Sequence, residues 1–253
     1  MDLGLADRRF LVGGASRGLG AAVARALVAE GARVAGASRQ APSGDTTRGA
    51  ITPIVADLSE PGGPAAAVAA AVGALGGLDG LVVNTGGPPG GAFAAVDEAT
   101  WQRAIEGTLF STLRLIREAL PHLREGRDPA IVVILSSSVR EPIPALVTSN
   151  VLRPGLAGLI KSLVTEIAPI RINGVAPGRF TTERVRSLDA ARAAESGATI
   201  EAVQAQTEAR IPLGRYGDPD ELGRVVAFLL SPAASYLDGV ILPVDGGMIR
   251  SLP

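Results

Sequence analysis

A cluster of glycines near the N-terminus has the spacing to bind a phosphate group. A short apolar run leads into Gly13-Gly14-Ala15-Ser16-Arg17-Gly18-Leu19-Gly20, and a helical pattern follows at once. Glycines let the backbone turn tightly and approach a phosphate, and the amides at a helix start favour anions. The spacing from Gly14 is GxxxGxG rather than GxGxxG, so the strand–turn–helix context supports the interpretation more than the glycines alone. The segment predicts a site for the pyrophosphate of a dinucleotide.

The end of the second apolar run bears on which dinucleotide fits. An acidic residue there would hold a ribose 2′-hydroxyl, but the run ends in Ser38 and Arg39. Arg39 and Arg17 offer two guanidiniums, which match a phosphate through forked hydrogen bonds. The alternative is that both are ordinary solvated arginines. We expect NADP(H) to be preferred over NAD(H).

The elements that must position these residues alternate along the chain. Short apolar runs of strand length are separated by segments with apolar residues at helical spacing. Runs that are apolar on both faces are typical of a parallel sheet covered by helices on both sides. The pattern predicts a single-domain α/β Rossmann fold with a doubly wound, seven-stranded parallel sheet. The predicted strands are residues 9–12, 33–37, 51–56, 78–83, 131–135, 171–176 and 239–244.

Local signals define several boundaries within this single domain of residues 1–253. Asp218-Pro219 followed by Glu221 predicts a helix start with a capping box. Pro243 in the last run predicts a strand at the sheet edge. The small-residue stretch 61–77 predicts a helix. Residues 179–217 interrupt the alternation and predict a helical lid over the substrate.

Composition and charge argue against several classes of function. The chain has 253 residues and a formal net charge of −1, with no dense basic run to bind nucleic acid. It has no cysteine and one histidine, His122, so we expect no metal site. The sequence shows neither a signal peptide nor a membrane-spanning segment. We therefore expect a cytoplasmic protein that acts on a small molecule.

The glycine segment and later landmarks together resemble the short-chain dehydrogenase/reductase (SDR) superfamily. The resemblance covers essentially the whole chain, and its tail is similar to the 3-oxoacyl-acyl-carrier-protein reductase branch. One departure is Gly13, where the family usually has Thr. The landmarks are Asp57-Leu58, Asn84-Thr85-Gly86-Gly87, Arg171-Ile172-Asn173, Pro177-Gly178, Ile211-Pro212-Leu213-Gly214-Arg215 and Pro243-Val244-Asp245-Gly246-Gly247.

This resemblance implies a role for each matching residue. Residues of the glycine turn would surround the pyrophosphate and ribose. The adenine would lie beside the residues after the third strand, and the nicotinamide beside those after the fourth and sixth. The implied cofactor-binding set is Gly14, Ser16, Arg17, Gly18, Leu19, Gly20, Ser38, Arg39, Asp57, Leu58, Asn84, Gly86, Arg153, Pro177, Gly178 and Thr182.

The sequence departs from the family at the catalytic residues. The family uses a Tyr, a Lys four residues later, a preceding carbonyl-binding Ser and an Asn in the long helix before it. Ser149 lies 13 residues after Ser136 and takes the place of the Tyr, and Arg153 takes that of the Lys. Thr108 takes the place of the Asn. Ser136 matches the carbonyl-binding Ser, with Ser137 as an alternative register.

These substitutions weaken the expected proton transfer. A serine hydroxyl is a far weaker acid than a phenol, whose pKa is about 10. Losing general acid catalysis slows a reaction by about 10²–10⁴-fold, so hydride transfer would be slow rather than impossible. Arg153 keeps a fixed charge and can hold a ribose. Pro154 is expected to kink the helix. Tyr216 and Tyr236 are expected to pack rather than to replace the missing Tyr.

Two hypotheses fit this pattern. The favoured one is an NADP(H)-dependent oxidoreductase acting on a carbonyl or alcohol substrate with an altered proton donor. The alternative is a non-catalytic dinucleotide-binding homologue that senses cofactor or scaffolds a complex. A dehydratase or epimerase on the same fold is less favoured, because fold alone does not fix function.

The lid and the likeness to the reductase branch raise two further expectations. Four lid arginines could meet an anionic group, but interleaved acidic residues favour a solvated helical face. The reductase branch implies a homo-oligomer, a tetramer that pairs residues 109–120 and 239–248 across two-fold axes. The lid charges are Arg179, Arg184, Arg186 and Arg192, with Glu183, Asp189 and Glu195 between them.

Overall fold

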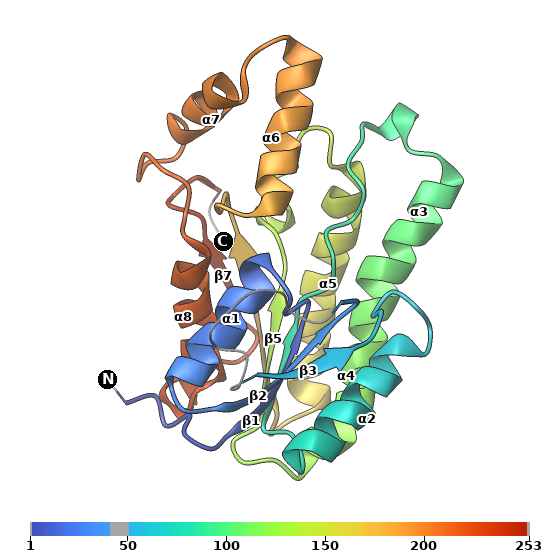
Figure 1. Cartoon of the computed structure of the whole chain (residues 1–253), viewed down its shortest axis with the longest axis vertical. Coiled ribbons are helices and arrows are strands. Elements are labelled where there is room, and N and C mark those ends of the chain that lie inside the picture. The colour runs from blue at the N-terminus through green and yellow to red at the C-terminus, as the bar shows by residue number, and fades with distance from the viewer. Residues whose placement is uncertain (1, 41–50, 252–253) are drawn as a thin grey trace.

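One parallel sheet runs through the computed structural model, which describes residues 2–40 and 51–251 (Figure 1). The strand order is β3-β2-β1-β4-β5-β6-β7. The chain order therefore reverses between β1 and β4, and the predicted doubly wound sheet of seven parallel strands is confirmed. The strands are β1 (Arg9–Gly13), β2 (Arg33–Ser38), β3 (Ile51–Val55), β4 (Gly80–Val83), β5 (Ala130–Ile134), β6 (Arg171–Pro177) and β7 (Ile241–Val244).

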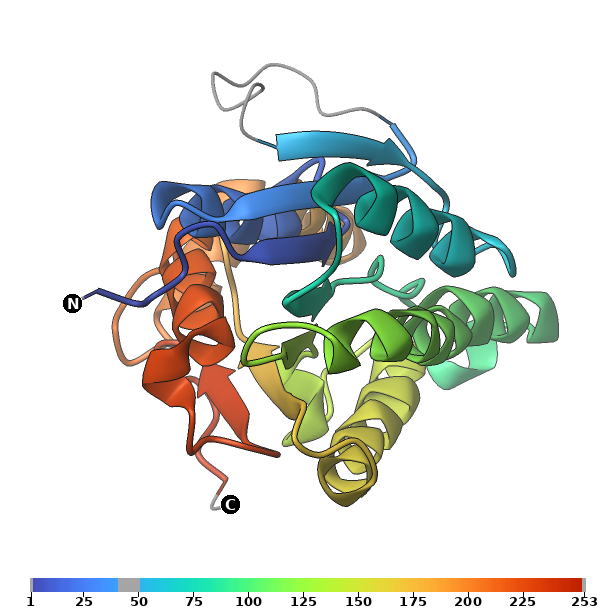
Figure 2. The same cartoon turned by 90° about the horizontal axis from the view of Figure 1, so that it is seen from below.

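Helices cover both faces of the sheet and produce two apolar cores (Figure 2). On one face α1 (Gly18–Ala29) packs against α8 (Pro219–Leu230). The other face carries α2 (Gly63–Leu75), α4 (Ser111–Arg124) and α5 (Val147–Glu166). The apolar stripes predicted from the sequence are buried, for example at Leu27 in α1 and Leu156 in α5. Shorter helical segments lie in the connections: η2 (Phe93–Ala95), α3 (Glu98–Ala104), the π-helical η3 (Ile105–Phe110), η4 (Ser137–Val139) and η5 (Pro232–Ala234).

The two edge strands, β3 and β7, are less buried than the sequence predicted. The five inner strands are almost wholly buried, whereas β3 and β7 consist mainly of partly buried or exposed residues. The expectation that every apolar run is covered on both faces is therefore wrong for these two. An edge strand is covered less completely because it has a neighbour on one side only. Pro243 lies in β7, so its predicted place at the sheet edge is confirmed.

Local predictions about helices are largely confirmed. Asp218 and Glu221 form the capping box at the start of α8, and the small-residue stretch contains α2. Helix α5 continues through Pro154 as a single element of 20 residues. Tyr216 is buried, as expected, but Tyr236 is fully exposed, so the expectation that it packs is wrong.

Residues 179–217 contain two helices, α6 (Glu183–Ser196) and α7 (Ile200–Glu208). Figure 1 shows both standing beyond the end of the sheet at which the strands finish. Parallel strands place all their carboxyl ends at this one edge, where ligands of open α/β sheets bind. In the described parts of the chain, no helix is both long and apolar enough to span a membrane.

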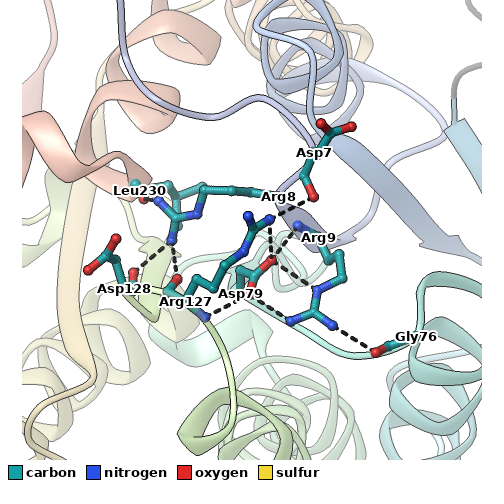
Figure 3. A network of polar contacts seen from close by, with 8 residues as sticks. All are labelled: Asp7, Arg8, Arg9, Gly76, Asp79, Arg127, Asp128 and Leu230. Carbon is teal, nitrogen blue, oxygen red and sulfur yellow. Dashed lines mark hydrogen bonds and ion pairs between the residues drawn. The ribbon is translucent and has the colours of Figure 1, made fainter.

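A buried carboxylate holds the opposite end of the sheet together (Figure 3). Asp79, at the start of β4, accepts hydrogen bonds from the backbone, Nε and NH2 of Arg9 at 2.9, 3.0 and 2.8 Å. It also accepts one from the Arg127 amide at 2.7 Å. Arg8 donates to the carbonyls of Arg127 and Asp128 at 2.6 and 2.7 Å. These contacts join the starts of β1 and β4 to the loop before β5.

We expect Asp79→Asn to lower the free energy of unfolding by about 3 kcal/mol, because it removes the buried anion that the partly exposed Arg9 and the Arg127 amide bind. Burial would raise the pKa of Asp79, but hydrogen bonds from Arg9 and Arg127 hold it at about 2 instead. A depressed folded-state pKa stabilises the protein above the unfolded value of about 4. About 2 kcal/mol should therefore be lost as the pH falls from about 4 to about 2. Urea titrations across this range measure both effects.

Asp128→Asn is the matched control, since it removes an exposed carboxylate from the same network. Arg8 contacts the backbone carbonyl of Asp128 rather than its side chain, so stability should change by less than about 1 kcal/mol. An Asp79 variant that kept the pH dependence of the parent between pH 4 and 2 would contradict this assignment.

Candidate functional site

The glycine turn lies directly against the end of β4. Nδ2 of Asn84 donates a hydrogen bond to the carbonyl of Gly13 at 3.2 Å. Gly14 has a φ of +61°, and a Cβ there would lie 2.6 Å from Asn84 Nδ2. A Cβ on Gly20 would lie 2.3 Å from the Gly14 carbonyl oxygen. Side chains are excluded from this turn because other groups already occupy the space.

The start of α1 presents its backbone amides at the edge of the sheet where the parallel strands end. Arg17 is the N-cap, and no described side chain caps the helix. First-turn amides have no partner within a helix, and the helix dipole adds positive potential, so both favour an anion. Gly18 has a φ of +58°, and a Cβ there would lie 3.6 Å from Cγ2 of Thr182. Ser16 and Leu19, both half-buried, complete the turn at which the sequence predicts a pyrophosphate site.

The predicted adenine side lies where β2 and β3 end. Ser38 is buried and donates to the carbonyl of Gln40 at 2.5 Å. Asp57 accepts from the amide and hydroxyl of Ser59 at 2.9 and 2.6 Å. This hydroxyl, with a smaller effect from the charge of Arg39, lowers the pKa of Asp57. Leu58 is buried beside Gly13, whose Cβ would lie 3.2 Å from Leu58 Cδ1, so the larger Thr of the family would be crowded here.

The two predicted phosphate-binding arginines each lie near a carboxylate. Arg17 NH1 contacts Glu183 Oε2 at 2.6 Å, with both side chains about two-thirds exposed, at 68% and 67%. Arg39 is exposed and acts on Asp57 electrostatically. Exposed ion pairs contribute about 0–1 kcal/mol, so a phosphate can displace either partner. The sequence pattern showed the arginines but not these acidic neighbours.

The predicted nicotinamide side contains both open and tightly packed glycines. No described atom lies within 4 Å of a Cβ placed on Gly86, after β4. A Cβ on Gly178 would lie 2.7 Å from Asp245 Cβ. The backbone just after Pro177, the last residue of β6, is therefore packed closely against Asp245. Thr182 caps α6 by accepting from the Val185 amide at 3.3 Å. Open space above Gly86 leaves its backbone free to face a ligand.

The serines at η4 meet the start of α5, where Ser149 lies. Ser149 is buried, and its Oγ lies 3.0 Å from Oγ of Ser138. Ser136, one of the two predicted carbonyl-binding serines, caps η4 by accepting from the Ser138 amide at 3.1 Å. Ser137 is buried beside it. Sequence reasoning singled out Ser136 and Ser137 but missed Ser138, which shares the same serine run.

Arg153 is a buried cation held by a neutral group. Arg153 is only 6% exposed, and its NH1 donates a hydrogen bond to the carbonyl of Ile134 at the end of β5. Its Nε has no hydrogen-bond partner among the described residues. Burial, and then the charge of Arg184, lowers the pKa of Arg153 to about 10, so it stays charged at neutral pH.

Thr108 lies in the π-helical turn η3, between α3 and α4. π-Helical turns often occur at functional sites because they displace backbone groups from regular pairing. Thr108 is buried, its carbonyl accepts from Thr112 Oγ1 at 2.7 Å, and its own hydroxyl has no partner among the described residues. That hydroxyl is therefore a buried polar group that no described residue satisfies.

The lid arginines divide into two pairs. Arg179 contacts buried Asp189 at 3.5 Å, and Tyr216 donates to the same carboxylate at 3.0 Å. Arg184 NH2 donates to the carbonyl of Pro88 at 2.7 Å. The expected solvated face is therefore wrong for Arg179, whose side chain is only 16% exposed, whereas Arg184 is an exposed residue that also contacts a backbone carbonyl. The expectation holds for the exposed Arg186 and Arg192.

Two neighbours of Ser149 were also missed from the sequence. Thr148 Oγ1 donates to the Pro89 carbonyl at 2.6 Å and ties α5 to the loop after β4. Asn150 bonds both the amide and the carbonyl of Ile143 at 2.9 Å and fixes the preceding loop. Both contacts join segments about 7 to 59 residues apart, which spacing along the chain does not reveal.

A glycine turn at the point where strand order reverses defines the Rossmann class of dinucleotide-binding folds. Residues 14–249 match the family model described as "Enoyl-(Acyl carrier protein) reductase". A 3-oxoacyl-[acyl-carrier-protein] reductase from Vibrio cholerae is 32% identical over 97% of this chain and 99% of that protein. The chain belongs to the short-chain dehydrogenase/reductase family, and its predicted resemblance to 3-oxoacyl-acyl-carrier-protein reductases is confirmed.

Solved structures give the same result. L-Sorbose reductase from Gluconobacter frateurii, complexed with NADPH and L-sorbose, has a TM-score of 0.92 and 27% identity, with 100% of both chains covered. An NADPH-bound short-chain oxidoreductase from Pseudomonas aeruginosa PAO1, described as containing an atypical catalytic center, has a TM-score of 0.84 and 29% identity. The match covers 98% of this chain and 100% of that one. Structural neighbours of this chain therefore bind NADPH.

We expect Gly86→Ala to weaken NADPH binding at least tenfold while the melting temperature changes by less than about 2 °C. The added methyl group meets no described atom, so only a bound molecule can collide with it. Fluorescence titration measures the dissociation constant. Gly155→Ala is the control, because its Cβ is also free of described neighbours but lies on an exposed position of α5. If both variants bound NADPH with equal affinity, Gly86 would not belong to the cofactor site.

Proposed function

We propose that this protein is an NADP(H)-dependent oxidoreductase that interconverts a carbonyl compound and an alcohol, with Ser149 and Arg153 in place of the family's Tyr and Lys. The observation that carries the proposal is the glycine turn at the strand reversal, where Asn84 leaves Gly14 and Gly20 no room for a side chain. Family membership and NADPH-bound neighbours support the same cofactor.

The residues around this turn would hold the dinucleotide along the carboxyl edge of the sheet. The amides at the start of α1 would hold the pyrophosphate, and Arg39, with Arg17, the 2′-phosphate. Asn84, Gly86, Pro177, Gly178 and Thr182 would surround the nicotinamide half. When bound, NADPH supplies the hydride that reduces a carbonyl carbon.

Ser149 would donate a hydrogen bond to the substrate carbonyl oxygen. A hydroxyl has one hydrogen and can also accept, so Ser149 Oγ can take the hydrogen of Ser138 and keep its own for the substrate. A serine does not ionise near neutral pH. This bond therefore polarises the carbonyl, and the growing negative charge is stabilised by the buried positive charge of Arg153. Water, rather than Ser149, would supply the proton that converts the resulting alkoxide into the alcohol.

A direct experiment separates this proposal from its main alternative, a non-catalytic dinucleotide-binding homologue. The alternative is favoured by the loss of the Tyr and by the Ser149 hydroxyl already having a protein partner. NADPH oxidation is measured against a panel of aldehydes, ketones and oxo acids, beside an NADPH-binding titration. Turnover above the rate without enzyme supports the oxidoreductase. Binding without turnover of any compound supports the alternative.

We expect NADPH to bind at least tenfold more tightly than NADH, a difference of about 1.4 kcal/mol or more. The cause is the pair of arginines beside the expected 2′-phosphate. Arg39→Ala should reduce the preference severalfold and leave NADH affinity unchanged. Calorimetry at fixed moderate salt measures both constants. Equal constants for the two cofactors in the parent protein would refute the preference.

We expect Ser149→Tyr combined with Arg153→Lys to raise kcat for carbonyl reduction by about tenfold or more, within the range of general acid catalysis. Each single change should have little effect, because the phenol needs a neighbouring cation of the right reach and the Lys has no acid to assist. Steady-state kinetics of the four proteins tests the coupling.

The pH profile of the parent enzyme provides the second check on Ser149. Because neither Ser149 nor Arg153 titrates near neutrality, kcat should be flat between about pH 6 and 8. Arg153→Gln should weaken NADPH binding without adding a titration. A limb in this range that disappeared in Ser149→Ala would show that Ser149 ionises, and the proposed mechanism would then be wrong.

We also propose a homo-oligomer, a tetramer of dihedral symmetry. Phe110, just before α4, and Val151 on α5 are exposed, and β7 is an open sheet edge. Exposed apolar groups on helices and an unpaired edge strand suit pairing across two-fold axes. Sedimentation velocity at micromolar concentration should show a tetramer, and Val151→Glu should dissociate it. A monomeric parent protein would contradict the proposal.

A further inference from the structure

Arg184 reaches from the first turn of α6 to the loop after β4. Its NH2 donates to the Pro88 carbonyl at 2.7 Å. A Cβ placed on Gly87 would lie 3.2 Å from Arg184 Nε, so the guanidinium lies on the backbone of residues 87–88. Arg184 is an exposed residue overall, yet removal of its charged end from water lowers its pKa.

The same loop reaches the start of α5 on its other side. Thr148 donates to the Pro89 carbonyl at 2.6 Å, and the next residue along α5 is Ser149. Arg153 lies one helical turn after Ser149 and extends to the end of β5. Arg184 therefore lies beside the loop that borders the serine pair and Arg153.

Neither arginine has an acidic partner in residues 2–40 and 51–251. Other arginines of the fold do: Arg9 pairs with Asp79, and Arg179 with Asp189. Arg153 and Arg184 instead donate to neutral carbonyls, and Nε of Arg153 has no partner within those residues. Arg153 is buried, and a buried charge without a counter-ion is unfavourable, so an anion bound nearby regains free energy.

We propose that the substrate is an oxo acid whose carboxylate is held by Arg184, with support from the charge of Arg153, while its carbonyl faces Ser149. A planar guanidinium matches a carboxylate through two parallel hydrogen bonds and selects it over a neutral ester. This inference rests on the proposed function and names the substrate class for that site.

The cofactor itself is a second source of anionic groups. Its pyrophosphate belongs at the start of α1, where Gly18 and Thr182 meet and where Arg17 lies. Arg184 instead contacts the loop of residues 87–88, where it donates to the Pro88 carbonyl. The position of Arg184 therefore favours the substrate carboxylate over a cofactor phosphate.

The test compares acids with their neutral esters in the presence of saturating NADPH at fixed ionic strength. Pyruvate, acetoacetate and levulinate place the carbonyl at three distances from the carboxylate, and each has a methyl ester of nearly the same shape. We expect at least one acid to bind tenfold or more tightly than its ester by calorimetry. Arg184→Gln should abolish that preference and change the NADPH dissociation constant less than twofold.

Arg186→Gln is the matched control, because it removes the same charge from an exposed position of the same helix. It should keep the acid preference of the parent. The inference is overturned if no acid binds better than its ester, or if Arg184→Gln weakens NADPH tenfold, which would assign Arg184 to a cofactor phosphate. Failure of the parent protein to bind NADPH would instead overturn the proposed function, and this inference with it.

Discussion

The contact between the ends of β1 and β4 sets the geometry of the whole site. Strand order reverses there, and Asn84 bonds the carbonyl of Gly13 so closely that neither Gly14 nor Gly20 has room for a side chain. The turn must therefore present backbone to a ligand, and α1 begins at its end. The Asp79 network pins the starts of the same two strands, so both ends of the central strand pair are fixed (Figure 3).

Positive charge around this contact is distributed unevenly. Arg17 has a carboxylate 2.6 Å away, and Arg39 lies near Asp57, so those two sites are partly neutralised and open to water. Arg153 and Arg184 bond only to carbonyls in the described chain. The family's Tyr–Lys pair moves a proton, whereas a serine beside a permanent cation polarises and binds. In the proposed mechanism, the altered residues would therefore serve anion and oxyanion binding rather than acid catalysis.

Much of the fold follows from local patterns. Strand-length apolar runs, the Asp218 capping box and Pro243 in an edge strand required only neighbouring residues, and each is confirmed. The wrong predictions concern burial, which depends on whether another helix or strand of the folded chain covers the residue. Tyr236 has no element over it, and β3 and β7 lack a strand on one side.

By itself, the sequence determined the parallel sheet and the glycine turn, because periodicity and backbone freedom are local properties of the chain. The positions that take the place of the family's catalytic residues stay a prediction from motif spacing. Only the tertiary structure decided that Ser138 meets Ser149, that Glu183 meets Arg17, and that Arg184 lies on the loop at Pro88. The last two contacts join residues 96 or more positions apart. Charges at that separation interact only once folding has fixed their distance and removed the water between them.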